Sequence, residues 1–127
     1  MGWLELITLL ALLEYLAMGL MVGRARETYN VAAPATTGDP TFERYYRVHQ
    51  NTLEALIIFI PAVWIFAMLV NRPLAIILGF AFIAARAWYA RSYVAEPASR
   101  ALGAIVTFGV NAILLLGAVI GLIVHSL

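Results

Sequence analysis

The sequence contains no cysteine and no lysine, and only 12% of its 127 residues are charged. Without cysteine the chain forms no disulfide, no thiolate metal site and no cysteine nucleophile, so any thiol chemistry requires a thiol on the substrate. All eight basic residues are arginines, whose planar guanidinium groups bind carboxylates through paired hydrogen bonds. The formal net charge of +1 gives no long-range field to attract nucleic acid, so we expect no nucleic-acid partner. We also expect no metal site.

Apolar residues, by contrast, are abundant. They make up 64% of the chain, and the mean hydropathy is +0.92, whereas soluble domains are roughly 45–50% apolar. Four apolar blocks approach the roughly 20 residues that a membrane-spanning helix needs. We therefore predict an all-α integral membrane protein, a four-transmembrane-helix bundle in a single domain over residues 1–127, with spans over about residues 2–22, 41–70, 73–93 and 98–124.

The connections between these spans predict the orientation of the chain. Four spans place both termini on one side of the membrane, and the polar connections over residues 23–41 and 94–100 on the other. Of the eight arginines, only Arg72 lies on the side of the termini. The positive-inside rule then makes the arginine-rich side cytoplasmic, with both termini on the opposite side of a bacterial inner membrane. Within the first connection, Asp39 followed by Pro40 is expected to cap and start the second helix.

A polar stretch over residues 43–54 runs directly into an apolar one. At about 100° per residue, one helical face carries four polar residues: Arg44, Arg47, Asn51 and Glu54. A helix that carries this face into a bilayer cannot leave it against lipid, because each unpaired charge there costs about 3 kcal/mol or more. We therefore expect the face to line a polar interior, which is the candidate site.

A second polar set lies at the end of the third span. Arg86, Tyr89 and Tyr93 are spaced so that they share a helix face, and Arg100 follows in the next connection. Arg26 is expected at the same end of the molecule. Arginines clamp carboxylates by paired hydrogen bonds, and tyrosines supply neutral donors. Together the sets suit a ligand that is anionic and polar at one end.

Both sets have alternative interpretations. Tyr89, Tyr93 and the neighbouring Trp88 could form an ordinary interfacial aromatic belt. Arg47 and Glu54 could simply neutralise each other between helices. The arginines left out of the site are expected to be topology anchors or contacts to lipid headgroups: Arg24, Arg44 and Arg91.

Three further polar residues have open roles. Glu14, near the middle of the first span, is either a hydrogen-bonded link between helices or a carrier of protons or cations. His49 is either part of the site or a solvated interfacial residue. Asn111, in the middle of the last span, is expected to hydrogen-bond another helix.

These polar residues also form a pattern that resembles a known family. The first motif consists of Glu43, Arg44, Arg47, His49, Asn51 and Glu54, and it looks like the hallmark of the MAPEG family, the membrane-associated proteins in eicosanoid and glutathione metabolism. The preceding loop, residues 34–42, resembles that of the branch with leukotriene C4 synthase and microsomal glutathione S-transferase 2. The type and spacing of Arg86, Tyr89, Tyr93 and Arg100 are similar to those found in the same branch. The resemblance covers essentially the whole chain and suits a bacterial member.

The resemblance implies a homotrimer with a glutathione site at each subunit interface, open toward the cytoplasm. By position, the glutathione-binding residues would be Arg26, Arg47, His49, Asn51, Glu54, Arg86, Tyr89 and Tyr93. Arg100 would be catalytic and would stabilise the glutathione thiolate. Glutathione would be the co-substrate of a glutathione S-transferase with possible peroxidase activity, whose acceptors are lipophilic electrophiles or lipid hydroperoxides. Ala55 and Glu27 depart from the pattern, since relatives often carry Tyr and Arg there.

Two other functions remain open. A small proton-coupled multidrug antiporter would explain Glu14 but would leave the arginine and tyrosine sets without a role. A non-catalytic lipid-binding protein of the same family is the second alternative, and retention of Arg100 argues against it. The sequence names neither the acceptor nor the choice between conjugation, peroxidase and isomerase chemistry.

Overall fold

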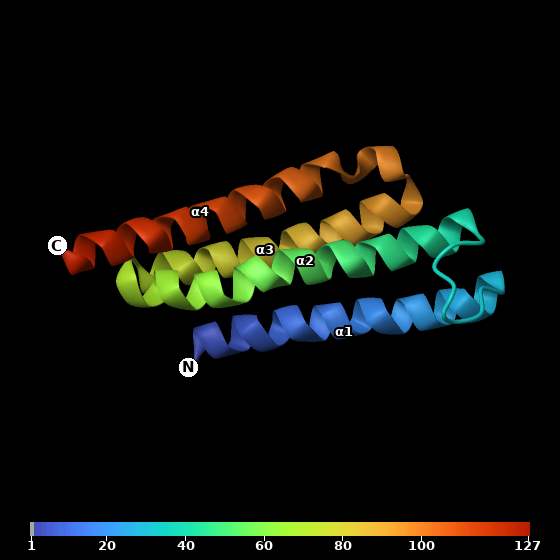
Figure 1. Ribbon diagram of the computed structural model, residues 1–127, viewed down its shortest axis with the longest axis horizontal. Helices are drawn as coiled ribbons and strands as arrows, with labels where there is room; N and C mark the ends of the chain where they lie inside the picture. The colour runs from blue at the N-terminus through green and yellow to red at the C-terminus, as the bar shows by residue number, and fades with distance from the viewer. Residues whose placement is uncertain (1) are drawn as a thin grey trace.

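The computed structural model, which describes residues 2–127, consists of four long helices joined by short connections (Figure 1). The elements in chain order are α1 (Trp3–Tyr29), α2 (Pro40–Leu69), α3 (Arg72–Ala95), the short 3₁₀ helix η1 (Pro97–Arg100) and α4 (Ala101–Ser126). By length and composition, each long helix could cross a membrane, α4 together with η1. The predicted all-helical architecture with four membrane-spanning segments is therefore confirmed at the level of the single chain.

The start of α2 follows the sequence prediction. The Asp39 side chain accepts hydrogen bonds from the backbone N–H groups of Thr41 and Phe42, each at 2.9 Å. Pro40 occupies the first helical position, where the missing N–H group would have no partner in any case. At the other end of the bundle, Asn71 caps α3 in the same way by accepting from Leu74 N at 2.8 Å.

Helix α1 is longer than the predicted span. It continues past Val22 to Tyr29, so the first connection is shorter than the expected residues 23–41. The reason is packing, because Val22 and Ala25 are buried against Phe42 at the start of α2. Arg24 and Glu27 in these last turns are exposed, so the fall in hydropathy after Val22 marks the expected end of the span and not the end of the helix.

The four helices do not surround one common axis equally. Helices α2 and α3 contact each other and both of the others, while α1 and α4 lie on opposite sides of this pair (Figure 1). The core between them contains Phe59 and Phe82, whose rings stack with centroids 3.9 Å apart. Close approach of α4 to α3 depends on Gly103, because a Cβ there would lie 2.9 Å from Tyr89 Cα.

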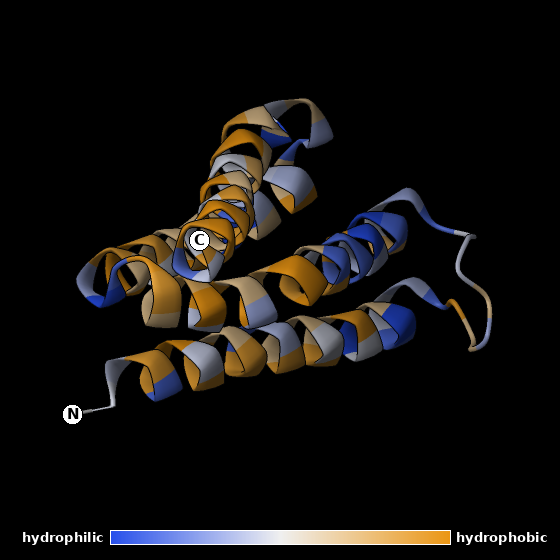
Figure 2. Ribbon diagram, turned by 60° about the vertical axis from the view of Figure 1, so that its left-hand side comes forward, coloured by the Kyte–Doolittle hydropathy of each residue, from blue (hydrophilic) through white to orange (hydrophobic). Residues whose placement is uncertain are grey.

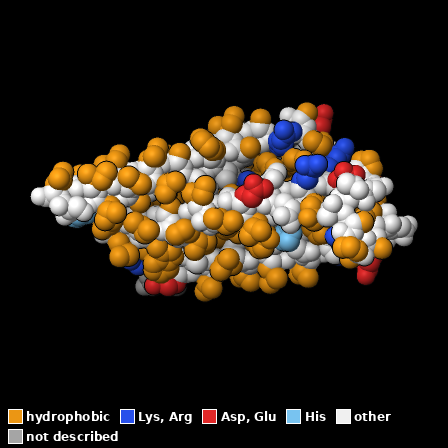
Figure 3. Space-filling model, viewed as in Figure 1, with side chains coloured by type: hydrophobic (Ala, Val, Ile, Leu, Met, Phe, Trp, Pro, Cys, Tyr) orange, Lys and Arg blue, Asp and Glu red, His pale blue; other side chains and the backbone are white. Residues whose placement is uncertain are grey.

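The ends of the molecule differ in polarity. Both termini lie at one end, and the α1–α2 and α3–α4 connections lie at the other (Figure 1). Hydrophilic residues concentrate near the α1–α2 connection, whereas hydrophobic residues dominate most of the helical length (Figure 2). On the face shown in Figure 3, most arginine side chains likewise gather in the half that carries the connections. The candidate site therefore belongs at this connection end.

Candidate functional site

The site is organised by a buried arginine on α3. The Arg86 side chain is 3% exposed, and its Nε and Nη2 donate to Thr52 Oγ1 on α2 at 3.2 and 2.8 Å. A longer contact of 3.5 Å joins Nη1 to Thr107 Oγ1 on α4. A buried charge needs compensating polar partners, and here two hydroxyl groups from two other helices supply them. Arg86 thus links α2, α3 and α4 at one level of the bundle.

A row of aromatic and basic side chains extends from Arg86 toward the connection end. The Arg86 guanidinium carbon lies 4.0 Å from the ring centroid of Tyr89, and the Tyr89 hydroxyl accepts a hydrogen bond from Asn51 Nδ2 at 2.6 Å. Tyr93 follows, with its ring centroid 5.6 Å from that of Tyr89. The Arg100 guanidinium carbon lies 5.7 Å from the ring centroid of Tyr93, and Arg100 Nη1 donates to the carbonyl of Pro97. The predicted face of α3 is therefore a continuous row of contacts.

A cavity of about 510 Å³ opens beside this row, between α2, α3 and α4. Four predicted site residues line it together: Asn51, Glu54, Arg86 and Tyr89. The remaining wall is largely apolar and includes Ala55, Ile58, Ala104, Phe108, Ala112, Leu115 and Leu116. The volume lies in the range of small-molecule sites, roughly 300–1,000 Å³. A guanidinium, an amide, a hydroxyl and a carboxylate beside an apolar wall suit a charged polar molecule placed next to a hydrophobic one.

Two predicted site residues on α2 are exposed on the surface of the single chain. Arg47 is exposed and lies one turn from Asn51 on the same face of the helix. Glu54 lines the cavity and is also exposed. The polar face predicted from residues 43–54 is therefore only partly covered within one chain.

Arg26 and His49 do not reach this cavity in a single chain. Arg26 Nη1 donates to the carbonyl of Ala35 at 2.7 Å, and its guanidinium lies 4.9 Å from the Phe42 ring. It thereby ties the α1–α2 connection to the helices. His49 stacks on Tyr15 of α1, with ring centroids 4.3 Å apart. Both side chains face the α1 side of α2, away from the cavity.

Sequence reasoning missed Thr52 and Thr107, which hold the buried guanidinium. Thr52 is fully buried, and the only signal in the sequence is its position directly after Asn51 in the polar stretch. Asn111 was expected to hydrogen-bond another helix, and this is confirmed, because its Nδ2 donates to the carbonyl of Ala55 on α2 at 3.1 Å. Its Oδ1 is buried and has no hydrogen-bond partner within residues 2–127.

Glu14 lies outside the cavity that contains Asn51 and Glu54. Its Oε1 is buried and accepts no hydrogen bond from any described residue, so the structure provides no hydrogen-bonded link between helices at this oxygen. The positive charge of Arg86 acts on the Glu14 carboxyl group from α3. Glu14 lines a separate cavity between α1, α2 and α3.

Comparison with known proteins identifies the family of this chain. Residues 4–120 match the MAPEG family, and the chain belongs to it. An uncharacterized protein of Synechocystis is 40% identical over 121 residues, which cover 95% of this chain and 88% of the relative. Human microsomal glutathione S-transferase 2 is 36% identical over 116 residues, which cover 91% of this chain and 79% of the relative. Bovine leukotriene C4 synthase is 30% identical over 121 residues, which cover 95% of this chain and 81% of the relative.

Proposed function

We propose that this protein is a membrane-embedded glutathione transferase that activates glutathione as its thiolate for attack on lipophilic acceptors. The observation that carries this proposal is the cavity between α2, α3 and α4, where Asn51, Glu54, Arg86 and Tyr89 adjoin a long apolar wall. A polar thiol tripeptide and a hydrophobic acceptor can meet at such a boundary. The names of the human and bovine relatives support the same chemistry.

Glutathione carries two carboxylates and one ammonium group, which the site residues match in charge. In this proposal Arg47 and Arg86 pair with carboxylates, and Glu54 pairs with the ammonium group. Asn51 and Tyr89 donate or accept at the peptide groups. The protein would be an oligomer, because exposed charges such as Arg47 and Glu54 on a membrane helix cannot face lipid. The resemblance to the MAPEG family implies that this oligomer is a homotrimer.

A neighbouring subunit would complete each site. Arg26 and His49 face the α1 side of their own chain, so they can contribute only to glutathione bound against another copy. The connection end, where most of the arginines lie, would face the cytoplasm, and both termini would lie across a bacterial inner membrane. Glutathione would then enter from the cytoplasm, and the acceptor from the lipid.

Arg100 would supply the activating charge. A free thiol with a pKa near 8.5 is only a few per cent thiolate at neutral pH, and a nearby guanidinium lowers such a pKa by about 1–3 units. The thiol proton passes to water, the sulfur forms a bond to the electrophilic carbon, and the leaving group departs with its electron pair. With a lipid hydroperoxide, the sulfur attacks the terminal oxygen and the O–O bond breaks to give the alcohol. The thiol of a second glutathione then attacks the sulfur of the resulting sulfenic acid, the S–O bond breaks, water leaves, and glutathione disulfide forms.

The proposal is tested by glutathione binding and by conjugation of a chlorodinitrobenzene, both with the purified protein in detergent micelles. Glu54→Gln should weaken glutathione binding by about 2–4 kcal/mol, because it removes the partner of the ammonium group. Glu5→Gln is the matched control, since Glu5 is an exposed carboxylate near the start of α1. Absence of saturable glutathione binding by the parent protein would reject the proposal.

A further inference from the structure

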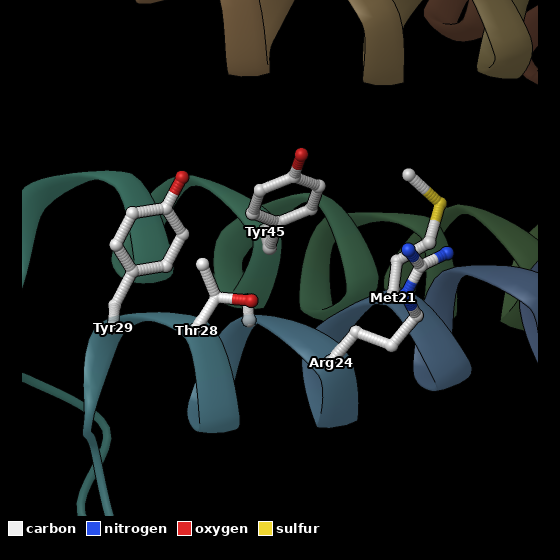
Figure 4. A pocket seen from close by; sticks show the side chains of 6 residues that line it. Met21, Arg24, Thr28, Tyr29 and Tyr45 are labelled. Atoms are coloured by element: carbon white, nitrogen blue, oxygen red, sulfur yellow. The ribbon is translucent and has the colours of Figure 1, made fainter.

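A second group of polar side chains surrounds a small cavity at the connection end of α1. This cavity of about 220 Å³ is lined by Met21, Arg24, Ala25, Thr28 and Tyr29 of α1 and by Tyr45 of α2. Figure 4 shows the side chains of Met21, Arg24, Tyr29 and Tyr45 projecting toward the same side of the α1–α2 pair. One guanidinium and three hydroxyl groups form a set of hydrogen-bond donors for an anion.

This polar cavity adjoins a larger apolar one. Met21 and Tyr45 line both cavities, and the second, of about 460 Å³, continues between α1, α2 and α3. Its walls are mainly apolar and include Met18, Val48 and Ala90. Methionine side chains adapt to ligands of different shape, and small alanine side chains leave room between helices. The two spaces together offer a polar head region and an apolar tail region.

The charges along the two cavities give the combined site a direction. Arg24 lines the outer cavity, and Arg91 lines the inner one on the part of α3 that approaches the connections. Glu14 lies at the other end of the inner cavity, seven residues before Met21, which is about 10 Å along a helix. A carboxylate repels an anion, so an acidic group is favoured only at the end with the arginines. A hydrocarbon chain attached to it would extend inward toward Glu14.

We propose that the two cavities form one binding site for an anionic amphiphile with a single hydrocarbon chain. The acidic headgroup binds Arg24 with the hydroxyls of Thr28, Tyr29 and Tyr45, and the chain lies between α1, α2 and α3. This site is separate from the cavity between α2, α3 and α4 and does not depend on glutathione. It also gives a specific ligand to Arg24, which the sequence suggested only as an anchor or headgroup contact.

Photolabelling of the full-length protein in micelles of a neutral detergent tests this proposal. The probe is a long-chain fatty acid with a diazirine near the end of the chain, and its methyl ester is the uncharged comparison. Labelled positions are mapped by peptide mass spectrometry. The acid should label residues 14–18 of α1 and residues 87–90 of α3, the walls at the inner end of the second cavity. The ester should label them about tenfold less at equal concentration, because it lacks a charge-assisted hydrogen bond.

Arg24→Gln isolates the headgroup interaction. Arg24 is exposed, so the exchange leaves the helix packing intact, and labelling by the acid should fall about tenfold to the level of the ester. The matched control is Arg72→Gln at the opposite end of the bundle, which should label like the parent. Equal labelling by acid and ester, unchanged labelling of Arg24→Gln, or label confined to Leu115 and Leu116 of the other cavity would each overturn the proposal. Glutathione affinity measured on the same samples is expected to stay unchanged, so failure here is distinguishable from failure of the transferase proposal.

Discussion

The guanidinium carbon of Arg86 lies 4.0 Å from the ring centroid of Tyr89, three residues further along α3. The same guanidinium donates two hydrogen bonds to Thr52 on α2. Tyr89 is therefore held by a side chain that is itself anchored to the neighbouring helix, and its hydroxyl accepts from Asn51 on that helix. One buried arginine thus fixes the position of a tyrosine that lines the candidate site.

Thr52→Val should weaken the site without changing the shape of the core. Valine fills nearly the same space as threonine, but it leaves Nε and Nη2 of Arg86 without their acceptor. A buried donor without a partner costs about 1–3 kcal/mol. We therefore expect the free energy of unfolding, measured by thermal unfolding, to fall by that amount, and glutathione to bind more weakly. Thr107→Val serves as the comparison and should have the smaller effect on binding, because the contact from Arg86 to Thr107 is 3.5 Å long. Equal effects of the two substitutions would contradict the assigned role of Thr52.

Tyr89→Phe and Asn51→Ala should not act independently. Each removes one partner of the 2.6 Å hydrogen bond between Asn51 Nδ2 and the Tyr89 hydroxyl. We expect each single variant to bind glutathione more weakly, and the double variant to lose less than the sum by about 0.5–3 kcal/mol. The measurement is a double-mutant cycle in glutathione affinity. Strict additivity would mean that the two residues contact the ligand separately or not at all.

Gly103→Ala should separate α4 from α3. A Cβ at this position would lie 2.9 Å from Cα, Cβ and N of Tyr89, where backbone atoms cannot move aside easily. Overpacking of this kind costs about 1–3 kcal/mol, and it should displace Tyr89 and lower activity. Gly109→Ala is the control on the same helix, because a Cβ there meets nothing within 4 Å. The melting temperatures of the two variants in detergent check the prediction, which fails if they are alike.

Glu14→Gln distinguishes transferase activity from transport. The exchange keeps the shape of the side chain and loses no hydrogen bond at Oε1, which has no partner. Glutathione affinity should stay within about twofold of the parent, because Glu14 lies outside the cavity that contains Asn51 and Glu54. Export of a cationic drug from vesicles is the complementary assay. Proton-coupled export that disappears in Glu14→Gln would favour the antiporter alternative.

The helices and their caps were predictable because their signals are local. Asp39 and Pro40 define the start of α2 through their own chemistry, and the structure confirms both. Asn111 was recognised as a helix-to-helix contact because an amide in an apolar helix needs a partner. The end of α1 was placed too early, because hydropathy reports the depth of a residue in the membrane, whereas helix length depends on packing such as that of Ala25.

The contacts that shape the site were less predictable because they join distant residues. Nothing in the sequence pairs Thr52 with Arg86, which are 34 positions apart. The spacing on α3 correctly placed Arg86, Tyr89 and Tyr93 on one face, but it could not show that Arg86 is buried while Arg47 is exposed. Whether Arg26 and His49 reach glutathione depends on a second subunit, so their roles remain predictions.

The most direct test of thiolate activation is the ultraviolet difference spectrum of bound glutathione at neutral pH, because the thiolate absorbs where the thiol does not. The parent protein should show the thiolate band on binding. Arg100→Ala should still bind glutathione but show the band only as the pH approaches about 8.5, the pKa of a free thiol. A parent spectrum without the thiolate band, or an Arg100→Ala spectrum identical to that of the parent at pH 7, would contradict thiolate activation by Arg100.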